Sequence, residues 1–84
     1  MNTQTSRSSR EIQDWIVAWV ARETKADPSS FEVSEPFVNL GLSSRQAVLL
    51  SGELEDWLER KLPANLVWDH PTIEKLADHL ARTA

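Results

Sequence analysis

The sequence predicts an all-α fold, a small up-down helical bundle of three main helices plus one short helix, with a long loop between helices one and two. Three observations support this prediction. Apolar residues recur at helical spacing in three separate segments of the chain. Serine or threonine stands where each of these segments would begin a helix. The four prolines fall between the segments, where they can end helices without breaking them.

Composition limits the classes of function. With 84 residues the chain forms one domain, and a domain of this size has little room for a deep catalytic pocket. There is no cysteine, which excludes disulfides and Cys-based zinc sites. The formal net charge of −4 disfavours nucleic acid as a partner and favours a basic protein surface. The two histidines have no further ligand at zinc spacing, so we expect no metal site.

The first residues indicate a linker and not a targeting segment. Residues 1–9 are rich in polar side chains and lack apolar periodicity, so we expect a flexible N-terminal linker there and a folded domain over residues 10–84. The same stretch lacks the apolar core of a signal peptide. No apolar run approaches the ~20 residues of a membrane span. We therefore expect a cytoplasmic protein that is monomeric as an isolated domain and has no membrane partner.

The first helix is predicted to begin near Ser8 or Ser9. Ser8 and Glu11 have the spacing of a capping box, in which each side chain accepts from the other residue's backbone N–H. The apolar stripe that follows consists of Ile12, Trp15, Ile16, Trp19 and Val20. Pro28 disfavours helical backbone at the residue before it, so the helix should end near residues 24–26. Most of the chain's four tryptophans should be partly buried, because so small a core needs their volume.

A long connection runs from about residue 27 to residue 42. It contains Pro28, Pro36 and Gly41, and no long helix fits between them. A connection this long inside a small domain is often functional. Because it contains several apolar residues, parts of it are expected to pack onto the bundle. These residues are Phe31, Val33, Phe37, Val38 and Leu40.

The second helix is predicted to begin at Ser43, because Gln46 three residues later completes a capping box. Its apolar stripe consists of Ala47, Leu50, Leu54, Trp57 and Leu58. Gly52 lies in the middle of this helix and costs about 1 kcal/mol relative to alanine, which indicates close packing or the approach of a partner. Pro63 marks the end of the helix.

The last part of the chain is predicted to hold one short and one longer helix. Residues 64–69 form a short apolar turn, and His70 is a turn residue after it. Thr72 can cap the last helix, whose apolar stripe consists of Ile73, Leu76, Ala77 and Leu80. Glu55 and Glu59 on the second helix are a conceivable acid–base pair. Acids on a helix surface are nearly always structural, however, so we do not expect an enzyme.

From Phe37 to Ala81 the sequence resembles the acyl carrier proteins of modular (type I) polyketide synthases. In that family a Leu-Gly-x-Asp-Ser motif opens the second helix, and here Leu40, Gly41 and Ser44 match it. Residues 62–72, which end in Asp-His-Pro-Thr, resemble the family's short third helix and the turn into the fourth. The sequence departs from the motif at Ser43, where the family has Asp, and at Arg45, where it has an apolar residue. The form Gly-Leu-Ser-Ser-Arg is similar to a subset of carriers near the loading end of synthases or beside fatty acyl-AMP ligases.

The resemblance implies that Ser44 carries a 4′-phosphopantetheine arm derived from coenzyme A, flanked by Gly41, Leu42, Ser43 and Arg45. Such an arm tethers acyl or polyketide intermediates as thioesters, and the domain, as part of a multienzyme synthase, presents them to partner enzymes without catalysis of its own. The implied partners are a phosphopantetheinyl transferase, an acyl-loading enzyme (acyltransferase or fatty acyl-AMP ligase) and a ketosynthase. The family docks its partners on the second helix, which implies a docking surface of Arg45, Val48, Leu49, Glu53 and Asp56.

The residues themselves favour Ser44 over Ser43 as the modified serine. If Ser43 is the N-cap, its hydroxyl is occupied by the backbone N–H of Gln46, whereas Ser44 at the first helical position faces outward. The start of a helix is exposed, and its dipole favours the negative charge of a phosphodiester. Gly41 lets the backbone turn tightly and leaves space beside the hydroxyl. Serine at position 43 keeps the capping role of aspartate but lacks its charge.

Two alternatives stay open at this point. A helical docking or scaffold domain, including a degenerate carrier, would use Ser44 only within the helix start and would carry no modification. A peptidyl carrier domain is a near relative of the acyl carriers, and the Asp-His-Pro-Thr turn argues against it. Whether Ser44 accepts phosphopantetheine separates the carriers from the scaffold.

Overall fold

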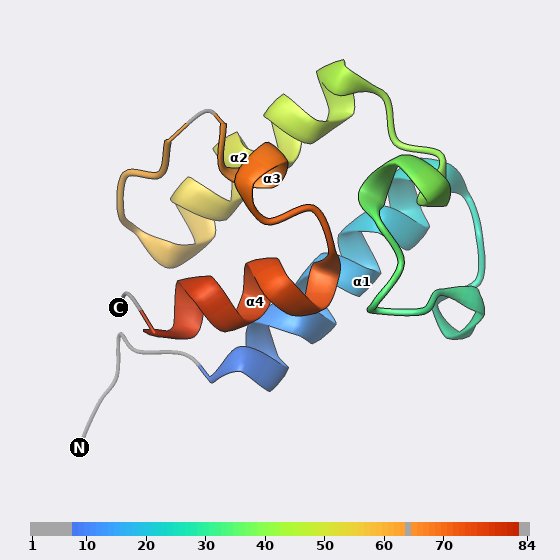
Figure 1. Cartoon of the computed structure of the whole chain (residues 1–84), viewed down its shortest axis with the longest axis horizontal. Coiled ribbons are helices and arrows are strands. Elements are labelled where there is room, and N and C mark those ends of the chain that lie inside the picture. The colour runs from blue at the N-terminus through green and yellow to red at the C-terminus, as the bar shows by residue number, and fades with distance from the viewer. Residues whose placement is uncertain (1–7, 64, 83–84) are drawn as a thin grey trace.

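The computed structural model describes residues 8–63 and 65–82 and confirms the all-α prediction (Figure 1). The elements, in chain order, are α1 (Ser9–Thr24), the 3₁₀ turn η1 (Pro28–Ser30), the 3₁₀ turn η2 (Phe37–Leu40), α2 (Ser44–Leu58), the short α3 (Leu66–Asp69) and α4 (Ile73–Arg82). No strand occurs among the described residues, which contain only an isolated bridge between Pro36 and Thr72. None of the helices in this part of the chain is long and apolar enough to cross a membrane.

Helix α1 begins and ends as predicted. Ser8 Oγ accepts from Glu11 N at 3.1 Å, and Glu11 Oε1 accepts from Ser8 N at 3.1 Å, so the capping box is complete. The helix ends at Thr24, and Lys25 adopts the left-handed conformation with φ 57°. Ser8 and Ser9, the last two residues of the expected linker, therefore belong to the helix start, while residues 1–7 lie outside the described part of the chain.

The core lies between α1, α2 and α4, and Figure 1 shows α4 lying alongside α1. The most deeply buried large side chains are Ile12, Ile16, Trp19, Val20, Leu50, Leu54, Leu66, Ile73, Leu76 and Leu80. Trp15 and Trp57 are partly buried and stack on each other with ring centroids 5.0 Å apart, which joins α1 to α2. The fourth tryptophan, Trp68, is half exposed, so the expectation that most of the indoles are buried in part is confirmed.

The long connection is held against the start of α4 by backbone hydrogen bonds. Phe37 N donates to Pro71 O at 2.8 Å, and Glu74 N donates to Val33 O at 3.0 Å. The prediction that parts of this connection pack onto the bundle is confirmed, since Phe37 is buried and Phe31, Val33 and Leu40 pack against the core. Val38 does not take part, because its side chain is 67% exposed. A 3₁₀ turn has three residues per turn, so the inward-facing Phe37 leaves its neighbour Val38 on the outer side.

Helix α2 ends five residues before Pro63, which was predicted to mark its end. Leu58 is its last residue, and Glu59 closes it in the left-handed conformation with φ 56°. The irregular segment that follows is held by Glu55, whose Oε2 accepts from Leu62 N at 2.8 Å. The helix stops early because a left-handed cap and this side-chain contact satisfy its final turn before the proline is reached.

The turn between α3 and α4 carries the predicted cap and one contact that was not predicted. Thr72 Oγ1 accepts from Lys75 N at 3.0 Å, which confirms Thr72 as the cap of α4. His70 follows α3 as expected. Its ring stacks on that of His79 with centroids 3.9 Å apart and an interplanar angle of 19°. This stack joins the turn to the last part of α4.

Candidate modification site

The two adjacent serines at the start of α2 differ in their hydrogen bonding. Ser43 is the N-cap, and its Oγ accepts from Gln46 N at 3.2 Å, while Gln46 Oε1 accepts from Ser43 N at 3.0 Å. Ser44 is the first helical residue and is exposed. Its hydroxyl makes no hydrogen bond to any other described residue. The two hydroxyls therefore differ, since that of Ser43 is engaged in the helix cap and that of Ser44 is not.

Gly41 and Leu42 fix the approach of the chain to these serines. Gly41 ends η2 with φ 88°, a left-handed conformation that side chains disfavour, and an added Cβ would meet nothing within 4 Å. Leu42 is only 8% exposed and belongs to the core cluster. The loop therefore turns sharply at an open position and is then anchored in the core by Leu42, two residues before the exposed Ser44.

The start of α2 suits a negatively charged substituent. The backbone N–H groups of the first helical turn have no partners within the helix, and the helix dipole places partial positive charge at this end. Arg45 is exposed beside Ser44 and forms no ion pair within the described residues. A phosphodiester on Ser44 would meet favourable charge and open space, so the local geometry fits a phosphorylated arm.

The predicted docking residues are spread along one helix but differ in character. Val48 and Leu49 are 53% and 46% exposed, and with Arg45 they give the first half of α2 an apolar surface with one positive charge. Glu53 is half-buried and Asp56 is exposed, both in the acidic second half. The one helix thus presents two chemically different surfaces, of which the apolar one lies next to Ser44.

Gly52 was predicted to allow close packing or the approach of a partner. Close packing is wrong, because Gly52 is exposed and a Cβ there would meet nothing within 4 Å. Instead, Gly52 lines a shallow hollow with Val48, Ser51, Glu55 and Leu62. The second alternative, the approach of a partner, stays a prediction.

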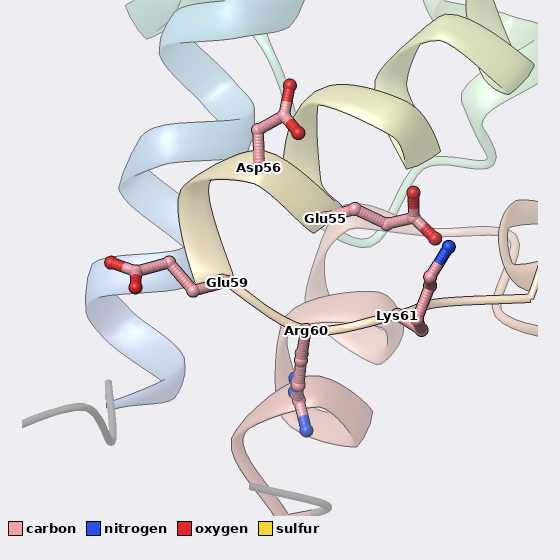
Figure 2. Close-up of a pocket in the computed structure, with 5 residues that line it drawn as sticks. All are labelled: Glu55, Asp56, Glu59, Arg60 and Lys61. Carbon is pink, nitrogen blue, oxygen red and sulfur yellow. The ribbon is translucent and has the colours of Figure 1, made fainter.

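The acidic end of α2 holds two structural contacts beside a hollow. A hollow of about 350 Å³ is lined there by Glu55, Asp56, Glu59, Arg60 and Lys61 (Figure 2). Glu55 already accepts from the backbone of Leu62, as described above. Figure 2 shows Arg60 directed away from the carboxylates towards α4, where its Nη2 donates to Leu80 O at 2.6 Å. Over the described residues, no group of three or more metal-ligating side chains occurs.

Two features of the surface were missed by the sequence interpretation. Val38 and Trp68 are exposed on the rim of a small hollow, which Pro36, Phe37, Val67 and Pro71 complete. The other is the stack of His70 on His79. Burial lowers the pKa of His79 below its usual value, as do the nearby positive groups His70, Arg60 and Arg82, while Asp69 acts in the opposite direction. Both features join residues distant in sequence, for which helical periodicity carries no signal.

The comparisons with known sequences point to one kind of domain. Residues 14–80 match the model of a family described as "Phosphopantetheine attachment site". Over 71 residues the chain is 35% identical to a phenolphthiocerol/phthiocerol polyketide synthase of Mycobacterium tuberculosis. That alignment covers 84% of this chain but only 4% of the synthase, so the chain spans a small part of this relative's length.

Solved structures share the fold over nearly the whole chain. An acyl carrier protein from Anabaena sp. PCC 7120, described as having a variant phosphopantetheinylation-site sequence, superposes with a TM-score of 0.86 and 35% identity. The superposition covers 99% of this chain and 94% of the chain of the Anabaena protein. A free-standing peptidyl carrier protein from Acinetobacter baumannii superposes with a TM-score of 0.84 and 33% identity, covering 90% of this chain and 95% of its own.

Proposed function

Since the chain belongs to the phosphopantetheine-attachment family, and is a carrier domain resembling those of polyketide synthases, we propose that Ser44 is the residue to which the 4′-phosphopantetheine arm is attached. The observation that carries this proposal is the difference between the two serines. The hydroxyl of Ser43 is engaged as the helix cap, whereas that of Ser44 is exposed at the helix start. The family consists of carriers, so the domain itself is not a catalyst.

In the attachment reaction the domain only has to present the hydroxyl of Ser44 to the transferase. The hydroxyl oxygen of Ser44 forms a bond to phosphorus of coenzyme A, the bond to the adenosine bisphosphate breaks, and the hydroxyl proton passes to a base of the transferase. Gly41 leaves open space at the turn before the serines, and the N-terminus of α2 favours the phosphodiester that results. The attached group supplies a thiol that holds an acyl chain as a thioester.

The surface next to Ser44 is proposed to bind the enzymes that act on the arm. A phosphopantetheinyl transferase, an acyl-loading enzyme and a ketosynthase are the partners that a carrier of a polyketide synthase requires. Arg45, Val48 and Leu49 would contact them first, because these residues are exposed nearest to Ser44. Glu53 and Asp56 would add salt-sensitive contacts to basic partner residues. We expect the domain to be cytoplasmic, to belong to a larger synthase, and to be monomeric when isolated.

The proposed cargo is an acyl or polyketide chain. The fold by itself does not separate this cargo from an aminoacyl group, because the peptidyl carrier from Acinetobacter baumannii has the same fold. The polyketide synthase relative, which matches over 84% of the chain, favours the acyl carrier.

The test is to measure the intact mass of the protein after incubation with coenzyme A, magnesium and a phosphopantetheinyl transferase of broad specificity. We expect the parent to gain one phosphopantetheine, Ser43→Ala to gain one as well, and Ser44→Ala to gain none. Circular dichroism of each variant establishes that it is folded before the assay.

Two results would contradict the proposal. A mass gain in Ser44→Ala that is lost in Ser43→Ala would move the site to Ser43. No gain in the folded parent with transferases of several types would support the alternative, an unmodified docking or scaffold domain.

A further inference from the structure

Arg45 carries a positive charge at a position where a helix does not favour one. It is the second residue of α2, at the end where the helix dipole places partial positive charge, and a cation there destabilises a helix. The first turn of α2 contains no acidic residue that could offset this charge. A residue that breaks a local rule of helix stability without a compensating contact indicates a functional role.

The guanidinium of Arg45 is not used within the described part of the fold. The residue is exposed, and its side chain makes neither an ion pair nor a hydrogen bond with any other described residue. The nearest acid along α2 is Glu53, eight residues further, which corresponds to about 12 Å along the helix axis. Helical side chains also tilt toward the N-terminus, so Arg45 is directed away from Glu53. Since this separation exceeds the screening length of about 8 Å at physiological ionic strength, the positive charge is available to a partner.

The outward side of α2 therefore carries its charges in a fixed order. Arg45, Leu49 and Asp56 follow one another at intervals of four and seven residues, a spacing that places them on one side of a helix. Arg45 and Asp56 are exposed, and Leu49, which lies between them, is 46% exposed. Starting from Ser44, a partner thus meets first a cation, then an apolar side chain, and last a carboxylate.

We infer that Arg45 determines which enzymes can act on Ser44, by pairing with a carboxylate that the partner presents beside its active-site entrance. The inference rests on the proposed function, since such an enzyme docks only if Ser44 receives the arm. Cations of the same partner lie opposite Asp56, so the two charges fix the direction in which the partner lies on α2. An enzyme with a cation beside its entrance is repelled by Arg45 and excluded. Position 45 is apolar in the carriers that the sequence resembles, so this selection follows from the chain's own residue and not from the family pattern.

Crosslinking without a spacer determines the sign of the partner's charge directly. Arg45→Lys keeps the positive charge and supplies an amine, which a carbodiimide couples only to a carboxylate in contact with it. The unmodified protein is mixed with the broad-specificity phosphopantetheinyl transferase in the absence of coenzyme A, and crosslinked peptides are identified by mass spectrometry. We expect position 45 to be joined to an aspartate or glutamate of the transferase, and Asp56 to be joined to one of its lysines.

Rate measurements separate this local contact from the overall charge of the domain. Arg45→Glu and the control Lys75→Glu change the net charge equally, and Lys75 is an exposed residue of α4. We expect Arg45→Glu to lower kcat/KM of arm attachment by at least about tenfold at physiological ionic strength, and by less in about 1 M salt, because the lost contact is electrostatic. Lys75→Glu should stay within about twofold of the parent, since a distant exposed charge is screened.

A third variant separates recognition from folding. Arg45→Gln removes the charge alone, so it should also slow arm attachment. In urea denaturation it should be at least as stable as the parent, because the unfavourable interaction of a cation with the start of the helix is lost. A slower reaction of a protein that is no less stable is therefore due to the contact with the partner.

The outcomes distinguish this inference from the proposed function. A folded parent that no transferase modifies contradicts both, because no enzyme of this kind then acts on Ser44. Attachment to Ser44 at the parental rate in Arg45→Glu overturns the inference alone. Faster attachment in Arg45→Glu, or the absence of a crosslink from position 45, means that the partner presents no carboxylate there and also overturns it.

Discussion

At the scale of single residues, one hydrogen bond makes two neighbouring serines unequal. Ser43 uses its hydroxyl to complete the capping box with Gln46, so its oxygen is held by a backbone N–H. Ser44 has the same side chain but stands one position later, at the first turn of the helix. Under the proposed function, the cap and not the chemistry of serine would therefore determine which of the two residues is modified.

Substitution of Ser43 should separate capping from modification. Ser43→Ala removes the acceptor for Gln46 N and should lower the free energy of unfolding by about 1 kcal/mol. Ser43→Asp places an equally good cap acceptor at this position, so its free energy of unfolding should lie within about 0.5 kcal/mol of that of the parent. Urea denaturation followed by circular dichroism measures both. Equal stability of Ser43→Ala and the parent would mean that this cap does not stabilise α2.

The two glycines should respond oppositely to the same change. Gly41→Ala forces a side chain into a left-handed backbone with φ 88° and should lower the free energy of unfolding by about 1 kcal/mol. Gly52→Ala fills open space on a regular helix and should raise it by up to about 1 kcal/mol. Each variant is the control for the other in urea denaturation. A stabilised Gly41→Ala would contradict the backbone argument.

At the scale of elements, the stacked histidines join the turn after α3 to the last part of α4. Protonation of both rings would place two positive charges 3.9 Å apart between ring centroids, beside Arg60 and Arg82 and with Asp69 as the opposing charge. The pKa of His79 is lowered in the folded chain, chiefly by burial. Protonation of His79 is therefore disfavoured while its ring stays in this stack.

The pH dependence of stability follows from the sign of that shift. The unfolded chain titrates His79 near its ordinary pKa of about 6.5, so below this pH the unfolded state binds more protons than the folded state. The histidine contribution to stability is complete above about pH 6.5, and is lost as the pH falls through the lowered pKa of the folded form. Thermal melts between about pH 7 and pH 5.5 should show a falling midpoint.

Two substitutions separate the contribution of His79 to the pH dependence of stability from that of other titrating groups. His79→Gln should show a smaller change of melting midpoint over the same pH range, and His70→Gln should also reduce it, since His70 contributes to the shift. The carboxylates are common to all three proteins over this range. An identical pH slope in His79→Gln and the parent would show that the stack does not couple protonation to folding.

Local signals in the sequence predicted the helices and caps, and non-local contacts account for what was missed. The capping boxes at Ser8 and Ser43 involve residues three apart, so their spacing is visible in the sequence. The same local signals did not show which apolar residues of the long connection face outward, because the 3₁₀ turn that exposes Val38 is not visible in the sequence.

The features of the candidate site also divide into those that the local sequence predicts and those that only the assembled fold brings together. Ser44 and its flanking residues were predicted from a motif of adjacent positions, and the structure adds the occupied hydroxyl of Ser43. The hollow at Val38 and Trp68 joins residues thirty positions apart, and no periodicity connects them. Its position depends on the hydrogen bond between Phe37 and Pro71, which is a property of the assembled fold.

At the scale of the whole molecule, one small core supports every exposed element. Proteins of ordinary stability unfold with about 5–15 kcal/mol, and an 84-residue domain belongs at the low end of that range. The side chains of α1, α2 and α4 meet in a single cluster. The loss of one large core side chain should therefore affect the entire fold, including the start of α2.

Adjacent leucines on α2 test this dependence. Leu50 is fully buried, and Leu50→Ala should lower the free energy of unfolding by at least about 2 kcal/mol. Leu49 is 46% exposed, and Leu49→Ala should change it by no more than about 0.5 kcal/mol. Urea denaturation of both variants gives the comparison. Similar losses in the two variants would mean that the division of α2 into core and surface sides is wrong.

The stack of Trp15 on Trp57 gives the domain a built-in optical signal. Two indoles held face to face at 5.0 Å couple their electronic transitions, so the folded chain should show a paired positive and negative band in circular dichroism that neither ring produces alone. Trp57→Phe should remove that couplet while the helical bands persist. Because the two rings belong to α1 and α2, the couplet reports when these helices come together, and it allows their association to be timed during refolding without any attached dye.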